Sequence, residues 1–384
     1  MTGAAPVVLH LEHTGSPGGA EFALVRMLRA DPAWDPRMLV PPGAAGFFRA
    51  RASDVEVAEV GSPQPAGVSG GGARAAAGAA GRLLVQAAAV RRHPWFRAAG
   101  LVDANTARAA AFGALAVRGT RMPFVVHLRD LVDATALGGF GFRTMTRLVL
   151  PRADGVIANS PTTLDSALPF VRDGVRTAVI PSASGLTVGR ARSARVPGPV
   201  RIGMLARIDP WKGQLLLLEA FASALGDSDA VLEFAGAPLF GHEDFLAQLR
   251  SRAVELGVAN RVRFLGQVDD VDAVLDGWDI AVQYSTRPEP LGQNVLQYLA
   301  AGCAVVVADE GGPAEWVDDD VNGRRVSPRD AVGLASALGA LAEDGQLRRR
   351  LGAAAAQTPE LLDDAAVAAQ HADFYTGLLA TGRR

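Results

Sequence analysis

Lysine is almost absent from this sequence of 384 residues: Lys212 is its one lysine, and the other 37 of its 38 Lys and Arg residues are arginine. Cysteine is equally scarce, and the single Cys303 excludes an internal disulfide bond and a zinc site built from cysteines. The formal charge of −2 provides no overall basic field. We therefore expect no nucleic-acid partner.

Long hydrophobic runs are missing as well. The chain starts without a basic stretch, and its first apolar run, at 6–11, is interrupted by His10 and followed by Glu12 and His13. The longest run of small and apolar residues, 71–90, contains Arg74 and Arg82. These features predict no signal peptide and no transmembrane helix. The expected location is the cytoplasm, and contact with the inner face of a membrane stays open.

Short apolar runs alternate with longer amphipathic segments along the chain, which predicts α/β domains with parallel sheets. The length suits two domains better than one. The strands expected in the first domain are 6–11, 37–40, 55–60, 100–104, 123–128, 155–159 and 177–181. Those expected in the second are 201–205, 231–236, 261–266, 279–284, 304–309 and 323–327.

These strands predict two Rossmann-like, doubly wound domains, at 1–183 and 200–365, which face each other across a cleft. A Gly-, Arg- and Ser-rich linker at 184–199 joins them, and a helix at 366–384 is expected to pack back on the first domain. Ligands of such sheets bind beyond the carboxyl ends of the strands, so the active site is expected between the domains. Region 61–99 is interpreted as a Gly-rich loop followed by a helix, with a lid or a disordered insertion as alternatives.

The stretch ARIDPWKG, residues 206–213, places Arg207 and Lys212 in the turn before a helix expected at 212–225. A diphosphate needs fixed positive charge, which the arginine fork and the compact ammonium both supply. The alternative is a pair of solvated charges at a helix start, which the helix dipole disfavours. The position of the only lysine favours contact with a charged ligand.

A second candidate is RPEPLGQN, residues 287–294. Gly292 opens a helix expected at 292–301, whose free amides and dipole suit a phosphate or a sugar hydroxyl. Glu289 is an acceptor that can take hydrogen bonds from a polyol. The alternative is an ordinary carboxylate at a helix start.

A third candidate is HTGSPGGAEF, residues 13–22, in which Gly15, Gly18 and Gly19 permit close backbone approach. The spacing is not GxGxxG, and no acidic residue ends the next strand. A nicotinamide-dependent dehydrogenase is therefore not expected. A glycine-rich turn without a ligand remains the alternative.

The motifs GGAE, GMLARIDPWKG, EPLGQNVLQYLAAGCAVVVADEGGPAEWV and VNGRRVSP resemble, in order and spacing, the retaining glycosyltransferases of family four, which have the GT-B fold. The resemblance spans nearly the whole chain and is most specific in 200–330. It implies transfer of a sugar from a nucleoside-diphosphate donor to a hydroxyl of a small natural product, a sugar or a lipid-linked glycan. It also implies that Arg207 and Lys212 hold the donor diphosphate and that Glu289 bonds hydroxyls of the transferred sugar.

The same resemblance assigns roles to backbone groups. The amides of Leu291, Gly292 and Gln293 are expected to meet oxygens of the sugar and the phosphates. Gly18 and Gly19 are expected to approach the phosphates or the acceptor from the first domain. These positions need close approach rather than particular side chains.

His127, at the end of the expected strand 123–128, matches a histidine that lies against the donor sugar in such enzymes. The alternative is a buried histidine that ties down a loop. The segment 263–267 matches the loop whose main chain reads the nucleobase, so Phe264 and Gly266 are expected near the donor.

Two departures from the family pattern bear on the substrate. Gln297 stands where a second glutamate usually accepts bonds from both ribose hydroxyls, and one acceptor oxygen weakens that grip. The donor therefore carries deoxyribose, or the diol is bound with one bond rearranged. The segment 179–185 lacks the Asn-Gly-Val-Asp common after this strand, which affects the acceptor side.

We expect no metal or other cofactor, because the cations and helix amides can stabilise the departing phosphate. Asp270 and Asp272 form a DxD, but on the opening turn of a helix, where acidic residues are common caps. The resemblance implies that the leaving phosphate oxygen takes the proton of the acceptor. The alternatives are an epimerase or a phosphorylase on the same architecture, and a catalytically idle homologue that acts with a partner protein.

Overall fold

The computed structural model describes residues 5–64, 73–189, 198–239 and 241–381. It divides into two compact units, which are treated separately below. The N-terminal unit comprises Met1–Gly185 and Leu362–Arg384, and the C-terminal unit comprises Leu186–Leu361.

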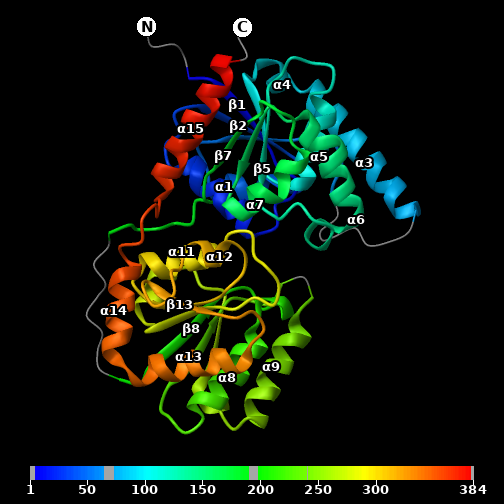
Figure 1. The fold of residues 1–384 in the computed structure, drawn as a ribbon. Helices are drawn as coiled ribbons and strands as arrows, with labels where there is room; N and C mark the ends of the chain where they lie inside the picture. The colour runs from blue at the N-terminus through cyan, green and yellow to red at the C-terminus, as the bar shows by residue number, and fades with distance from the viewer. Residues whose placement is uncertain (1–4, 65–72, 190–197, 240, 382–384) are drawn as a thin grey trace. The chain divides into compact units, whose positions relative to one another are not determined.

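The N-terminal unit is built on a seven-stranded parallel sheet in the order β3-β2-β1-β4-β5-β6-β7. Its central strands are buried on both faces because helices cover them (Figure 1). The strands are β1 Val7–Leu11, β2 Asp35–Val40, β3 Glu56–Glu59, β4 Leu101–Ala104, β5 Phe124–Leu128, β6 Gly155–Ala158 and β7 Arg176–Val179. The helices are α1 Gly19–Arg29, α2 Ala45–Arg49, α3 Ala73–Arg92, α4 Pro94–Ala98, α5 Ala107–Ala116, α6 Ala134–Thr144, α7 Pro161–Ala167 and α15 Asp364–Thr381.

The C-terminal unit is built on a six-stranded parallel sheet in the order β10-β9-β8-β11-β12-β13. Its strands are β8 Arg201–Leu205, β9 Val231–Ala235, β10 Val262–Gly266, β11 Ile280–Gln283, β12 Ala304–Ala308 and β13 Gly323–Val326. Its helices are α8 Gln214–Leu225, α9 Glu243–Glu255, α10 Val271–Asp276, α11 Gln293–Ala300, α12 Gly311–Glu315, α13 Ala331–Glu343 and α14 Gly345–Ala355. All the strands that the sequence predicts are present in the two sheets.

Each sheet reverses its strand order at one point, and this point positions the candidate sites. In the N-terminal unit the reversal lies between β1 and β4, and in the C-terminal unit it lies between β8 and β11. The loops after these paired strands diverge to opposite faces of the sheet and leave a crevice at their carboxyl ends. The residues that follow these four strands are therefore the first candidates for contact with a ligand.

Helix α15, although late in the sequence, belongs to the N-terminal unit (Figure 1). Its Val367, Phe374, Tyr375 and Leu378 are buried in one hydrophobic cluster with residues of β1, α1 and β2. The predicted helix at 366–384 thus starts at Asp364, and the residues after Thr381 lie outside the described residues.

The region 61–99 is more helical than its glycine content indicates. Helix α3 spans Ala73–Arg92, contains two glycines, and packs against α5. The many alanines, which are the strongest helix formers, outweigh the glycines. Residues 65–72 and 190–197, which hold parts of the predicted loop and linker, lie outside the described residues.

Two boundaries differ from the predictions. Leu186, expected in the linker, is buried in a hydrophobic cluster of the C-terminal unit. The helix expected at 212–225 is two elements, a 3-10 turn at Pro210–Lys212 and α8 from Gln214, because Gly213 between them has φ 82°. A Cβ atom at Gly213 would lie 1.9 Å from the carbonyl oxygen of Tyr284, so the close approach requires glycine. Lys212 therefore lies in the turn before the helix rather than in it.

Candidate functional site

A buried ion pair lies beyond the carboxyl ends of β8 and β11 in the C-terminal unit. The Lys212 ammonium lies 2.8 Å from Oε1 of Glu289, and the two side chains are only 15% and 7% exposed. Two residues that the sequence singles out in separate motifs, 77 positions apart, are thus brought together at the switch point of the sheet. Each charge compensates the burial of the other.

Glu289 is ionised in this setting. Burial acts to raise the pKa of its carboxyl, but the charge and hydrogen bond of Lys212, with hydrogen bonds from Ser285 and Gln283, together lower it. All three donors reach Oε1: Lys212, the Ser285 hydroxyl, and Nε2 of Gln283 at 2.9 Å. Oε2 has no hydrogen-bond partner among the described residues. The carboxylate is therefore held by one oxygen and can accept from a ligand with the other.

Trp211, which precedes Lys212 in the same turn, lies close to three cations. The Lys212 ammonium lies 4.0 Å from the centre of the indole, and the guanidinium carbons of Arg287 and Arg207 lie 4.2 and 5.6 Å from it. Arg207 also donates from Nε to Asp209, at 3.1 Å. The indole and Asp209 allow like charges to share a small region, because both interact favourably with cations. The predicted cationic turn is therefore assembled, with Arg287 as a third member.

Helix α11 begins next to this turn. Gly292 precedes it with φ 73°, and a Cβ atom there would lie 2.7 Å from Cγ of Pro313. Asn294 donates to the carbonyl of Leu205, and the amide of Leu205 donates to the Tyr298 hydroxyl at 2.7 Å. Burial raises the pKa of Tyr298, which stays a neutral phenol. These bonds fix the start of α11 against the end of β8.

The remaining predicted donor positions lie on several elements. Leu291 is buried in the hydrophobic cluster beneath α11, and Gln293 and Gln297 lie half-buried on that helix. Phe264 stacks on Phe234 with ring centres 5.4 Å apart, so its side chain serves the core. Gly266 ends β10 with φ 70° and open space beside it. Any contact there with a nucleobase would come from the main chain, as the resemblance implies.

In the N-terminal unit a buried polar network links the central strands. Asp103 on β4 lies between two histidines, with Nδ1 of His10 at 2.9 Å and Nε2 of His127 at 3.1 Å. Trp34 donates to Nε2 of His10, and Arg129 lies 3.1 Å from Nδ1 of His127. Since tryptophan and arginine can only donate, each histidine carries its hydrogen on the nitrogen that faces Asp103.

His127 is enclosed by this network. Its side chain is 2% exposed, and its ring stacks on that of His371 from α15, with centres 5.0 Å apart. Burial lowers the pKa of His127 more than Asp103 raises it, and burial with His127 nearby lowers the pKa of His371 to about 3. Both ring nitrogens of His127 face groups of the unit itself. This enclosure agrees with the alternative of a buried histidine that ties down a loop, and contact of His127 with a donor sugar stays a prediction.

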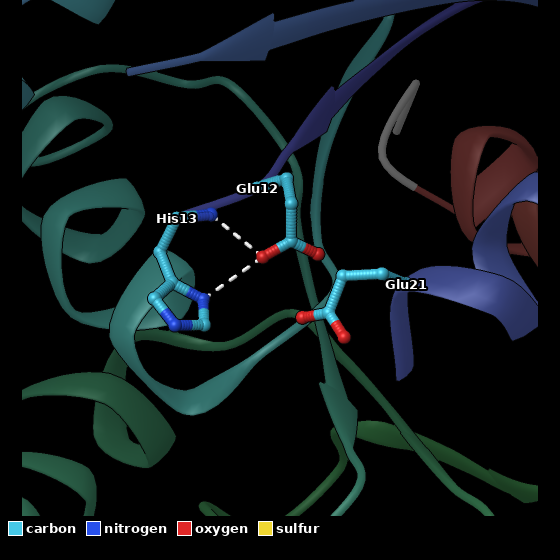
Figure 2. A group of neighbouring side chains, drawn as sticks. All are labelled: Glu12, His13 and Glu21. Carbon is cyan, nitrogen blue, oxygen red and sulfur yellow. Dashed lines mark hydrogen bonds and ion pairs between the residues drawn. The ribbon is translucent and has the colours of Figure 1, made fainter. Parts of the chain in front are cut away.

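Directly after β1, three ionisable side chains form a group whose possible ligand atoms lie within 4.8 Å of one another: Glu12, His13 and Glu21 (Figure 2). Burial acts to raise the pKa of Glu12, but hydrogen bonds from His13 and Asn105 and the charge of His13 lower it. Burial and the charge of Glu12 raise the pKa of Glu21 to about 8. At neutral pH Glu12 therefore carries the negative charge and Glu21 carries a proton.

This group is satisfied by protein donors. Oε1 of Glu12 accepts from the backbone amide of His13 at 2.6 Å and lies 2.9 Å from its Nδ1, while Oε2 accepts from Asn105 at 2.6 Å. A metal ion bound here would have to displace these bonds and the proton of Glu21. The group as it is built suits hydrogen bonding better than metal ligation.

The glycine-rich turn packs closely against other groups of the N-terminal unit. A Cβ atom at Gly18 would lie 2.5 Å from Oε2 of Glu21, and one at Gly15 would lie 2.5 Å from the carbonyl oxygen of Ala44. These two glycines make room for groups of the protein itself. The approach of Gly18 and Gly19 to the phosphates or the acceptor stays a prediction.

The sequence did not reveal the buried polar groups of the N-terminal unit. Glu12, Asp103 and Asn105 each end or follow a strand, as ligand-binding residues of such sheets do, and that position was the available signal. In the C-terminal unit, Trp211 and Ser285 lie next to residues that were identified. Their roles depend on side-chain packing that spacing alone does not predict.

Comparison with known proteins identifies a family for the C-terminal half. Residues 189–358 match the family model "Glycosyl transferases group 1". A lipopolysaccharide core biosynthesis glycosyltransferase of Rhizobium meliloti is 38% identical over 113 residues, which are 29% of this chain and 33% of that protein. A D-inositol 3-phosphate glycosyltransferase of Geodermatophilus obscurus is 33% identical over 213 residues, or 50% of this chain and 46% of that protein. The chain thus spans between a third and about half of these curated relatives.

Solved structures match over more of the chain. The Anabaena protein HepE in complex with UDP-glucose is 26% identical, with a TM-score of 0.78 over 97% of this chain and 100% of that one. A sucrose-phosphate synthase of Thermosynechococcus elongatus has the same fold at 19% identity, with a TM-score of 0.78 over 98% of this chain and 100% of that one. The two-unit α/β architecture is that of the GT-B fold, as the sequence predicts. Among the described residues no helix has the length and apolar character needed to cross a membrane.

Proposed function

Because this chain belongs to the glycosyl transferases group 1 family through residues 189–358, we propose that it transfers a sugar from a nucleoside-diphosphate donor to a hydroxyl acceptor. The observation that carries the proposal is the buried Lys212–Glu289 pair beside the start of α11. A carboxylate with one free oxygen suits a sugar hydroxyl, and a cation next to helix amides suits a diphosphate. HepE, whose structure contains UDP-glucose, supports this class of donor.

The proposed roles follow from the contacts. Lys212 and Arg207 stabilise negative charge on the departing diphosphate, and Arg287, which also lies near Trp211, adds to this field. Glu289 accepts a hydrogen bond from the transferred sugar through Oε2. The acceptor is a sugar, a small natural product or a lipid-linked glycan.

We further propose retention of the anomeric configuration and independence of metal ions. In a same-face substitution, the leaving phosphate oxygen takes the proton of the acceptor hydroxyl as the new glycosidic bond forms. Positive charge built into the turn would then do the work that Mg²⁺ does in other transferases. Asp270, the first residue of the DxD, caps α10 by accepting from the amide of Ala273 at 2.9 Å. This hydrogen bond gives Asp270 a structural role.

A thermal-shift series tests the donor. UDP, GDP and dTDP would be added separately to the full chain, with EDTA or with Mg²⁺, and we expect at least one to raise the Tm equally in both conditions. A shift that requires Mg²⁺ would contradict metal independence, and the absence of any shift would contradict a nucleotide-sugar donor. With the best base identified, NMR of the product from the matching donor sugar distinguishes a retained glycoside from an inverted one, an epimerised sugar or a sugar phosphate.

A further inference from the structure

A hollow of about 690 Å³ lies at the amino ends of β5, β6 and β7 in the N-terminal unit. This is the edge of the sheet opposite the carboxyl ends of the strands, where the residues considered so far are found. The end of α15 completes its wall through Leu378 and Thr381. The volume falls within the range of pockets that hold small molecules, about 300–1,000 Å³. The sugar transfer proposed above makes no use of this hollow.

The lining of the hollow is rich in arginine. Its charged residues are four arginines and two aspartates: Arg121, Arg152, Arg172, Arg176, Asp154 and Asp173. Four positive charges against two negative ones leave a surplus of two positive charges. Apolar side chains, among them those of Pro123 and Leu378, line the hollow as well. This combination suits a small organic molecule that carries an anionic group.

Two of the arginines are held in place by the protein. Asp154 accepts from Nη1 of Arg152 at 2.7 Å and from Nη2 of Arg172 at 3.4 Å. Arg152 also donates to the carbonyl of Met122 at 3.0 Å, and Arg172 donates to the carbonyl of Ala153 at 2.9 Å. A guanidinium group has five N–H donors, so each of these two arginines keeps donors for a ligand.

The other two arginines lack an anionic partner. Neither Arg121 nor Arg176 forms a hydrogen bond or an ion pair within the part of the chain that the structure describes. The guanidinium carbon of Arg176 lies 5.2 Å from the ring centre of Phe374 on α15. A Cβ atom at Gly377 would lie 2.7 Å from the same carbon. Glycine is unfavourable inside a helix, and here it makes room for the arginine.

We infer that this hollow binds a small phosphate monoester, whose phosphate is contacted by Arg121 and Arg176. A phosphate monoester carries nearly two negative charges at neutral pH, which matches the surplus charge of the lining. Its oxygens accept from the forked donors of arginine. A phosphate diester, such as a lipid headgroup, carries only one charge and fits less well. The inference does not depend on the proposed transferase function.

Isothermal titration calorimetry of the full chain with glycerol 3-phosphate tests the inference. A double variant, Arg121→Gln with Arg176→Gln, is expected to bind this probe at least about tenfold more weakly, because two charge-assisted contacts are lost. Both side chains are exposed, so its Tm should match that of the native chain. The matched control, Arg143→Gln with Arg147→Gln, removes two exposed arginines of the same unit and should bind as the native chain does. Gly377→Ala keeps every charge but displaces the guanidinium of Arg176, and it should weaken binding a few-fold.

Repeating the titrations with excess UDP separates the hollow from the donor site. Binding that persists with UDP supports the hollow, whereas binding that UDP abolishes would belong to the donor site and would overturn the inference. The inference would also be overturned if the native chain did not bind the probe, or if the control variant lost as much affinity as the variant of the hollow. Glycerophosphoglycerol, a phosphate diester, should bind more weakly than glycerol 3-phosphate. Equal binding would assign the hollow to a lipid headgroup and would overturn the choice of a monoester.

Discussion

The two units have similar sheets but opposite charge. The N-terminal unit contains 21 arginines against 16 acidic residues, whereas the C-terminal unit contains 17 basic residues against 24 acidic ones. Yet the cluster of three cations around Trp211 lies in the acidic unit, and the buried anions Glu12 and Asp103 lie in the basic one. Net charge therefore says little about what a site in either unit can bind. The local arrangement of charged side chains determines which ligand a site can bind.

The buried polar groups of the two units also differ in whether they leave an atom available to a ligand. In the N-terminal unit, Asp103, His127 and Arg129 lie in contact with one another, and the first two are buried within the unit. In the C-terminal unit, the Lys212–Glu289 pair leaves one carboxylate oxygen without a partner among the described residues. This contrast predicts that substitutions in the first network reduce stability and that substitutions in the second reduce activity.

The largest expected effect is on activity and comes from Lys212→Met. Loss of a prearranged cation is expected to lower kcat/KM about 100- to 1,000-fold, and the buried, unpaired Glu289 is expected to lower the Tm as well. The double variant Lys212→Met, Glu289→Gln is expected to regain stability but not activity, and Lys212→Arg keeps the charge as a control. Recovery of activity in the double variant would show that the pair has only a structural role.

The next effect is on stability and comes from Asp103→Asn. Burial acts to raise the pKa of Asp103, but His127 and His10 hold it well below its ordinary range, so the carboxylate is an ionised partner of two histidine rings. It is hydrogen-bonded to Nδ1 of His10 at 2.9 Å and lies 3.1 Å from Nε2 of His127. An amide can accept from one of them and would direct its own N–H group at the other. We expect a loss of about 2–4 kcal/mol in the free energy of unfolding, measured by urea denaturation. Tm shifts by nucleoside diphosphate should persist, and their loss would contradict the contrast between the units.

A smaller, pH-dependent effect is expected from Glu21→Gln. The pKa of Glu21 is about 8 in the folded chain and near 4.5 in the unfolded chain, so the native protein loses stability as pH rises from about 4.5 to 8. Glutamine does not titrate, and the variant should gain on the order of 3 kcal/mol relative to the native chain between pH 5 and pH 8. Urea denaturation at several pH values measures the difference. Glu343→Gln, at an exposed site on α13, is the control and should show no such trend.

The smallest effect is expected from Gln297→Glu on α11. A carboxylate can accept from both hydroxyls of a ribose, whereas an amide offers one acceptor. We expect the variant to bind UDP a few-fold more tightly relative to dTDP than the native chain does, as measured by isothermal titration calorimetry. An unchanged ratio would mean that Gln297 does not contact the pentose.

The sheets could be predicted from the sequence because apolar runs such as 124–128 and 304–308 are buried on both faces and stand out from their surroundings. The helix expected within 61–99 is α3 at Ala73–Arg92, where the many alanines outweigh the two glycines. The separate 3-10 turn at Lys212 depends on the positive φ of Gly213, which sequence periodicity does not report.

The candidate donor site was predicted in part. Lys212 and Glu289 were each identified, but their direct pairing was not, because it depends on how the loops after β8 and β11 approach each other. The network around Asp103 was missed because its members come from β1, β4, β5 and α15, which are distant in the sequence. Buried polar contacts over such separations leave no periodic signal.

Helix α15 has a consequence for the order in which the chain folds during synthesis. The ribosome releases Leu186–Leu361, the whole C-terminal unit, before it releases the segment that fills the cluster around β1 and α1. The sheet that is made first therefore lacks the side chains of Phe374 and Tyr375 until synthesis of the whole chain is complete. A chain that ended at Leu361 would contain the whole C-terminal unit and would leave an apolar face of the N-terminal unit uncovered.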